Sequence, residues 1–277
     1  IAQVLDPPGP IHLRAWNKGL NEQEKDTEEG ISKNRRAIPY VHQREADVMW
    51  AKRVWQEIDL RQKINHPLYY PEQPVRHRKS LMQTLLDAAN EGLVVYKDED
   101  FKLPMNPSEL EDKMNRKDTI TVPNPFDPNY DTIMVIDVSF NTADVWKYWI
   151  IEDWFFCRER SVLEKRIKAI APITERPIRD ETTGEFIDRR AEIFFWVYFP
   201  HARPYLARTE TFNRFNDTER MSFDDLFFKR MFEGRIIKVD NVHDRFIVQY
   251  QLGLDVLLEA DRIKNEFNTF EMDLWEY

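Results

Sequence analysis

Two aromatic runs constrain the fold of this chain more than any other feature. They are WKYWIIEDWFF at Trp146–Phe156 and IFFWVYF at Ile193–Phe199. Successive side chains of a strand point to opposite faces, and in these runs both faces are bulky and apolar or aromatic. Such strands need cover on both sides, from helices or from another subunit. We expect them at the centre of a sheet, with an assembly surface as the alternative.

The sequence from Asp131 onward has the alternation and the β-branched content of strands. The predicted strands are Ile133–Phe140, Trp146–Cys157, Ile167–Ile173, Glu192–Phe199, Ile236–Val239 and Phe246–Leu252. Glu181–Gly184 reads as a turn. Helices are expected near Pro204–Phe212, from Ser222 to Phe232 and from about Leu254 to Phe267. Strands in runs with inserted helices predict an α+β fold with a mainly antiparallel sheet.

The segment Arg44–Asn65 is predicted to be an amphipathic helix that ends before Pro67. One apolar stripe recurs at three-four spacing and contains Trp50, Ala51, Val54, Trp55 and Ile58. Favourable ion pairs are expected one turn apart, between Glu57 and Arg61 and between Asp59 and Lys63. The two tryptophans are expected in the core, and an exposed docking face is the alternative.

A second helix is expected from Ser80 to Asn90. Ser80 is a plausible N-cap, and Gln83 would complete a capping box. Gly92 can provide the left-handed residue that ends the helix. A short strand, Leu93–Tyr96, should follow. The polar, proline-rich residues 97–130 then predict a long loop or a hairpin excursion.

An internal similarity links the two halves of the chain. Ser80–Asp98 aligns without gaps onto Ser222–Asp240: each segment has a serine, an amphipathic helix, Glu-Gly, a short apolar strand and an aspartate. A duplication would give two similar helix–strand lobes, 44–130 and 131–277. The alternative is that a common unit occurs twice by chance, within one globular domain, 44–277.

Residues 1–43 are predicted to be an extended N-terminal arm rather than a domain. Prolines punctuate the segment, an acidic patch precedes a basic one, and few apolar residues recur at any period. A flexible linker and an arm that orders on a neighbouring molecule are both compatible with this pattern. For the second case the candidate partner-binding residues are Ile11, Trp16, Arg35 and Arg36.

The composition argues against several classes of function. The seven glycines are scattered, so no loop resembles a phosphate or dinucleotide cradle. A net charge of −9 disfavours nucleic-acid binding. The single cysteine, Cys157, excludes an intrachain disulfide and is expected to be buried. The histidines lack metal-ligand spacing, so we predict no metal and no cofactor. Neighbouring carboxylates such as Glu152-Asp153 and Asp224-Asp225 are expected to be solvated.

The stretch READVMWAKRVWQEIDLRQKINHPLYYP at Arg44–Pro71 closely resembles the GldN/PorN family of gliding-motility and type IX secretion proteins, and is closest to the PorN type. SLMQTLLDAANEG and the aromatic region are also similar, so the resemblance covers about residue 40 to the end. Its most distinctive positions are Arg44, Trp50, Trp55, Asp59, Arg61, Tyr69, Tyr70 and Pro71. These residues are treated as a structural motif, since no catalytic residues are known in the family.

The resemblance implies a non-enzymatic structural subunit of a periplasmic ring. Members of the family are exported with a cleaved signal peptide, and the start of this chain, IAQVLDPPGP, lacks the character of one. The expected partners are the outer-membrane lipoprotein GldK/PorK, further copies of the chain, and the periplasmic part of the motor protein GldM/PorM. Contact with the membrane is then expected only through a partner. The runner-up is a protein that binds or hydrolyses peptidoglycan, with carboxylates from separate strands or exposed tryptophans.

Overall fold

The computed structural model describes residues 35–75, 78–123, 131–179, 186–214 and 220–273. The described part is an α+β fold built on one seven-stranded antiparallel sheet, which confirms the predicted class. The strand order is β11-β1-β5-β6-β8-β2, and β7 also pairs with β6. Two further sheets, β3–β4 and β9–β10, each have two strands.

The large sheet consists of β1 (Val48–Asp59), β2 (Val95–Tyr96), β5 (Val145–Cys157), β6 (Val162–Arg179), β7 (Phe186–Ile193), β8 (Trp196–Tyr198) and β11 (Arg235–Val239). The small sheets consist of β3 (Asn115–Pro123), β4 (Asp131–Ser139), β9 (Glu210–Thr211) and β10 (Met221–Ser222). The α-helices are α2 (His66–Tyr69), α3 (Leu81–Asn90), α4 (Pro107–Met114), α5 (Phe199–Arg208), α6 (Phe223–Phe228) and α7 (Leu254–Asp273).

The aromatic run at Trp146–Phe156 forms β5, which lies between β1 and β6 as predicted. Its two faces serve different cores. Tyr148 and Ile150 pack with residues of α3, α5 and α6, whereas Ile151 packs with Trp55 and Trp196. The second run was predicted as one strand, Glu192–Phe199. Trp196–Tyr198 do form the strand β8, but the run is interrupted before it. β7 stops at Ile193, and Phe199 already begins α5.

The prediction of a helix at Arg44–Asn65 is wrong, because most of this segment is the strand β1. β1 pairs with β5 along its whole length and with β11 over Val54–Glu57. The expected helical ion pair of Glu57 is replaced by cross-strand pairs with Lys147 at 3.3 Å and Arg235 at 3.0 Å. Lysine, arginine, glutamine and glutamate favour a helix locally, but pairing and burial between two strands outweigh that preference.

α3 confirms the predicted helix and its two ends. The Ser80 hydroxyl accepts a hydrogen bond from the Gln83 N–H, while the Gln83 side chain bonds Asp87 instead of closing the capping box. At the other end Gly92 has φ +112°, and the N–H groups of Gly92 and Leu93 bond back into the last turn. This is the expected left-handed glycine cap.

The internally similar segment behaves differently at its glycine. α6 ends at Phe228, before the predicted Phe232, and Arg230 (φ +52°) takes the left-handed position. Gly234 instead allows close approach to β1, since a Cβ there would lie 2.8 Å from Gln56 Oε1. The two similar units end at opposite edges of the sheet, in β2 and β11. Whether they arose by duplication stays a prediction.

The chain after β11 forms a loop, the turn η5 (Ile247–Gln249) and then α7. The strand predicted at Phe246–Leu252 is therefore wrong. The Asn241 side chain organises the loop by donating to the Val239 and Arg245 carbonyls and accepting from the His243 and Arg245 N–H groups. α7 confirms the predicted final helix, and Val256, Ala260, Ile263 and Phe267 form its buried side.

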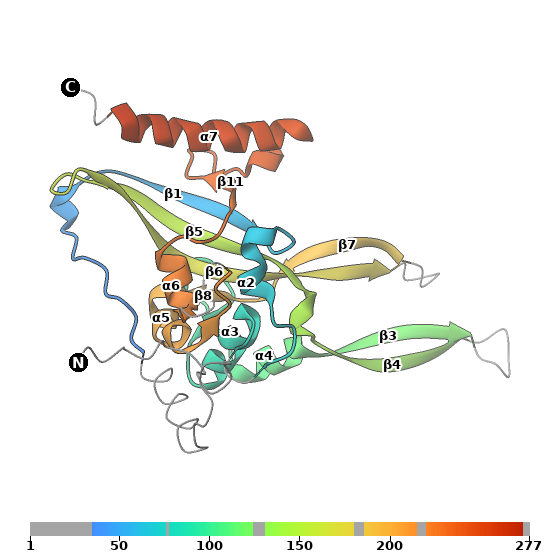
Figure 1. Cartoon of the computed structure of the whole chain (residues 1–277). Coiled ribbons are helices and arrows are strands. Elements are labelled where there is room, and N and C mark those ends of the chain that lie inside the picture. The colour runs from blue at the N-terminus through green and yellow to red at the C-terminus, as the bar shows by residue number, and fades with distance from the viewer. Residues whose placement is uncertain (1–34, 76–77, 124–130, 180–185, 215–219, 274–277) are drawn as a thin grey trace, which may run out of the picture.

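Figure 1 shows two β-ribbons projecting to the same side of the molecule, β3–β4 and the outer part of β6–β7. α7 lies beside β11, away from α3, α4, α5 and α6. The region predicted as a loop or hairpin, 97–130, contains α4 and β3. The helix expected near Pro204–Phe212 begins earlier, at Phe199, and ends at Arg208. The turn predicted at Glu181–Gly184 lies outside the described residues. The strands on either side of it, β6 and β7, are described and pair with each other.

Candidate interaction surface

A strap of irregular chain, residues 35–47, runs from α6 to the start of β1 (Figure 1). Three arginines from the folded domain hold it. Arg203 donates to the Ile38 carbonyl at 2.6 Å and Arg166 to the Val41 carbonyl at 2.7 Å. Arg160 donates to the Gln43 side chain at 3.0 Å. The second part of the predicted arm is therefore docked on the chain's own domain.

Arg203 is the main anchor of the strap. Its guanidinium forms two hydrogen bonds with the Asp224 carboxylate, at 2.7 and 3.0 Å, and both side chains are buried. The Tyr40 ring lies against the same guanidinium, 4.1 Å from ring centre to Cζ. Burial raises the pKa of Tyr40. The expectation that Asp224 is solvated is wrong, because an ordered strap and a buried arginine cover it.

The four predicted partner-binding residues fall in two places. Ile11 and Trp16 lie outside the described residues. Arg35 lies at the α6 end of the strap, 3.4 Å from Asp225 and within 3.3 Å of the Arg220 carbonyl. Arg36 is exposed. Their role toward a partner stays a prediction, and of the two described arginines only Arg36 is exposed.

Glu152 is the most deeply buried carboxylate of the sheet, although it was expected to be solvated. Arg230 bonds both of its oxygens, at 2.8 and 3.0 Å. The Gln56 amide and the Trp154 indole N–H add bonds of 3.0 and 2.7 Å. Its neighbour Asp153 is about two-fifths exposed and pairs with Arg53, as expected of a surface pair. A glutamate inside WIIEDWFF was the sequence signal that one carboxylate must be buried.

The family-motif tryptophans both pack within the molecule. Trp55 is buried, donates its indole N–H to Glu99 at 3.0 Å, and lies under the Lys238 ammonium. Trp50 is half-buried and contacts the Phe267 and Phe270 rings of α7. The prediction that these tryptophans serve the core is correct for Trp55. Trp50 instead joins the start of β1 to the final helix.

The turn after β1 contains the next motif residues. Asp59 accepts hydrogen bonds from both the backbone and the side chain of Arg61, and the side-chain bond lowers the pKa of Asp59. The buried Asn65 bonds the Asp59 carbonyl and both the carbonyl and the N–H of Glu233. Asn65 thereby joins this turn to the loop that precedes β11.

The remaining motif residues also have structural contacts. Tyr69 donates to the Ala143 carbonyl and stacks on Trp146. Tyr70 is half-exposed, stands edge-on to Tyr69, and precedes a cis peptide bond to Pro71. Arg44 is exposed and pairs with Asp47 at 2.7 Å in the strap. The motif residues therefore shape β1, its turn and the short helix α2.

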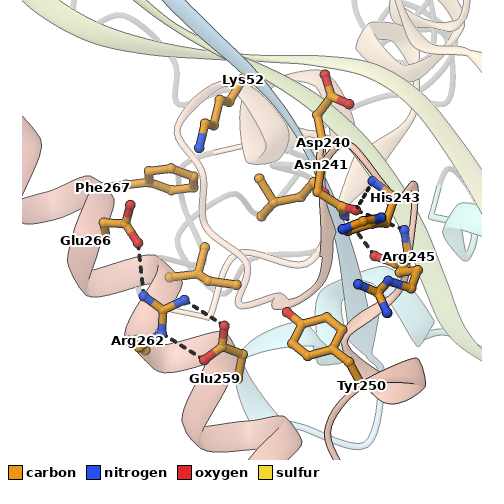
Figure 2. Close-up of a pocket in the computed structure, with 12 residues that line it drawn as sticks. Lys52, Asp240, Asn241, His243, Arg245, Tyr250, Glu259, Arg262, Glu266 and Phe267 are labelled. Atoms are coloured by element: carbon orange, nitrogen blue, oxygen red, sulfur yellow. Dashed lines mark hydrogen bonds and ion pairs between the residues drawn. The ribbon is translucent and has the colours of Figure 1, made fainter.

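The hollow in Figure 2, about 410 Å³ in volume, lies between α7, the end of β11 and the Asn241 loop. We call it the α7 hollow. Its floor is apolar, with Phe267 and Ile263, and its rim carries charges of both signs. Arg262 pairs with both Glu259 and Glu266. The hydrogen bond from Arg262 lowers the pKa of Glu259. A carboxylate held in its charged form is a poor general acid.

A second hollow of about 450 Å³, the Phe155 hollow, lies on the opposite face of β1. It is lined by Gln43, Val48, Ala51, Lys52, Arg53, Asp153, Phe155, Arg166 and Asp240. Lys52 and Asp240 border both hollows, which therefore flank the same stretch of strand. Sequence reasoning missed both hollows, because it treated Arg44–Asn65 as a helix.

The described residues contain no group of three or more histidine, cysteine or acidic side chains placed to hold a metal ion. Cys157 is buried, as predicted. Among the described helices, none is both long and apolar enough to span a membrane. The prominent features are instead contact features: a docked strap, projecting ribbons and two hollows beside one strand.

These features define a class, an α+β protein with a large antiparallel sheet, projecting β-ribbons and two hollows beside β1. A family model described as gliding motility associated protein GldN matches residues 43–276, and the chain belongs to this family. A search of curated proteins finds no match. Membership confirms the resemblance seen in the sequence and associates the chain with gliding motility and type IX secretion.

Proposed function

We propose that this chain is a non-enzymatic structural subunit of a periplasmic ring in the type IX secretion and gliding machinery, of the PorN type. It binds the outer-membrane lipoprotein GldK/PorK, contacts further copies of itself, and receives the periplasmic part of GldM/PorM. The observation that carries the proposal is the family match over residues 43–276. Contact with the outer membrane is then made through the lipoprotein.

The geometry supports a role in assembly in two ways. The β3–β4 and β6–β7 ribbons extend beyond the core (Figure 1), which gives the chain reach toward neighbours. The carboxylates of greatest burial, Glu152 and Asp224, are each neutralised by an arginine. Buried carboxylates that pair with an arginine hold a fold together.

The runner-up, a peptidoglycan hydrolase, requires two facing carboxylates or a histidine–carboxylate pair in a cleft. The α7 hollow contains His243 and Asp240, but no ion pair or hydrogen bond joins their side chains in the described structure. Glu259 and Glu266 share Arg262. No observation therefore favours the hydrolase, and co-sedimentation with purified sacculi remains the assay that would revive a role in glycan binding.

Co-expression with the lipoprotein tests the proposal. The full chain is expected to co-purify with GldK/PorK as one high-mass species in size-exclusion chromatography. The matched control is the lipoprotein expressed with an unrelated periplasmic protein. Two separate low-mass peaks at micromolar concentration of both proteins would contradict the proposal.

A further inference from the structure

The outer edge of β1 has an unpaired stretch. β1 pairs with β5 from Val48 onward, but its pairing with β11 begins only at Val54, with one more bond from the Asp240 N–H to the Arg53 carbonyl. Backbone groups of alternate residues point to the same edge of a strand, so those of Ala51 face the same way as those of Arg53. Among the described residues, no strand pairs with β1 there. Met49 and Ala51 are also exposed.

The α7 hollow and the Phe155 hollow lie on the two faces of this free edge. Trp50 and Lys52 face α7. Ala51 and Arg53 point to the other face, where they lie beside Phe155 and Asp153 of the neighbouring strand β5. An extended peptide that adds to a sheet edge gains main-chain hydrogen bonds, and its alternate side chains enter pockets on opposite faces. The edge and its two hollows have this arrangement.

We propose that the free edge of β1 accepts an extended segment from the arm of a second copy of the chain, residues 22–29. Glu22, Glu24, Asp26 and Glu28 alternate with other residues, so in an extended chain they would share one face. Two cations of the α7 hollow, Lys52 and Arg245, have no carboxylate partner among the described residues. Asp240 is the one lining carboxylate that no arginine or lysine of the described residues pairs with, so the unpaired charge of the hollow is positive. The other rim carboxylates, Glu259 and Glu266, are bonded to Arg262.

The length of chain favours a second copy over the same chain. Only residues 30–34 separate the acidic run from Arg35, so Glu29 can lie at most roughly 22 Å from Arg35. Arg35 is held beside α6, and the strap of residues 35–47 runs from there to the start of β1 (Figure 1). A contact from one copy's arm to the next copy's edge is head-to-tail, which builds a ring when it closes. This inference rests on the proposed function and specifies how two copies of the chain would contact each other.

Disulfide trapping between two populations of full-length chain tests the inference. One population carries Ala51→Cys, and the other carries a larger tag and one arm cysteine, at Gln23, Lys25, Thr27, Glu24 or Asp26. Because Ala51 faces away from α7, the odd arm positions should cross-link to it about tenfold more than the even ones under mild oxidation. Lys102→Cys, an exposed position in the loop after β2, replaces Ala51→Cys as the control.

The substitution Ala51→Pro provides an independent test. The Ala51 N–H points to the free edge and not to β5, so proline should be tolerated in the fold and block strand addition. We expect an unchanged melting temperature and about tenfold less self-association, measured by sedimentation velocity. Lys52→Glu should weaken association similarly, and Glu24→Lys with Glu28→Lys in the arm should restore it.

Three outcomes would overturn the inference. They are equal cross-linking at odd and even positions, yields no higher than with Lys102→Cys, and no cross-link between the tagged and untagged populations. Each of these leaves the proposed function standing if the chain still co-purifies with the lipoprotein. Conversely, an odd–even pattern without lipoprotein binding would support the edge contact and contradict the wider proposal.

Discussion

At the scale of single residues, the stability of this protein depends on carboxylates placed inside the sheet and at its turns. Glu152 has four hydrogen-bond donors around it and no exposure to solvent, while its neighbour Asp153 lies on the opposite face with solvent around it. Two adjacent, chemically similar residues therefore make very different contributions. The alternation of a strand is the cause, because it turns one carboxylate inward and the next outward.

Glu152→Ala should destabilise the protein by about 3–5 kcal/mol, since it leaves the Arg230 guanidinium without its partner beside the buried Gln56 and Trp154 donors. Asp153→Asn is the matched control and should cost about 0–1 kcal/mol, as expected for an exposed ion pair. The measurement is the free energy of unfolding in urea. Equal costs for the two variants would contradict this account of the sheet.

Asp59 should make the stability depend on pH in the acid range. The Arg61 side chain lowers the pKa of Asp59 in the folded state, so the folded protein binds this proton less readily than the unfolded chain. The stabilisation is therefore present above the unfolded pKa of about 4 and is lost as the pH falls through the folded pKa. Asp59→Asn should cost about 0.5–1 kcal/mol at pH 7.

Urea unfolding of wild type and Asp59→Asn between neutral and acid pH checks this sign. The gap between the two curves should close as the pH falls. A gap that stays constant or widens on acidification would show that Asp59 does not contribute through its charge.

At the scale of elements, the sequence was sufficient where local signals and tertiary packing agree. The serine cap and Gly92 delimit α3, and the aromatic run at Trp146–Phe156 gives β5. It failed for β1, whose apolar residues fit a helical stripe but are shared between two faces of a strand. The pairing partners of β1, in β5 and β11, lie about 100 and 180 residues away in the chain, so no local pattern could report them.

The candidate surface was predictable only in part for the same reason. Period-two alternation predicted the aromatic strands, and the proline pattern predicted the arm. The strap contacts depend on Arg203 and Arg166, which come from α5 and β6. The free edge of β1 depends on where β11 ends. Both features exist only after distant elements come together.

Asn65 tests how the elements are joined. Its amide connects the turn after β1 to the loop before β11 through three backbone hydrogen bonds, and it is fully buried. Asn65→Ala should cost about 2–4 kcal/mol because buried backbone groups lose their partners. The exposed Gln62→Ala removes only a 3.3 Å bond from the Asn65 amide to the Gln62 side chain and should cost less than about 0.5 kcal/mol. Comparable melting temperatures for both variants would show that this junction is unimportant.

At the scale of the whole molecule, the N-terminal arm divides into two parts. Residues 35–47 belong to the domain because buried or half-buried arginines hold their carbonyls. Deletion of residues 1–34 should therefore leave the melting temperature unchanged while it weakens self-association. Deletion of residues 1–43 should also lower stability, by about 2–4 kcal/mol, since the strap bonds to Arg203 and Arg166 are lost with it. Identical melting curves for the two deletions would contradict the division.

The function that we propose for this chain is assembly with other chains. It is tested by the mass and shape of any particle that the full-length chain forms with the proposed lipoprotein partner, determined by mass photometry and electron microscopy. We expect a closed ring that contains many copies of both proteins. A homogeneous monomer, or a small complex that does not grow with concentration, would contradict it.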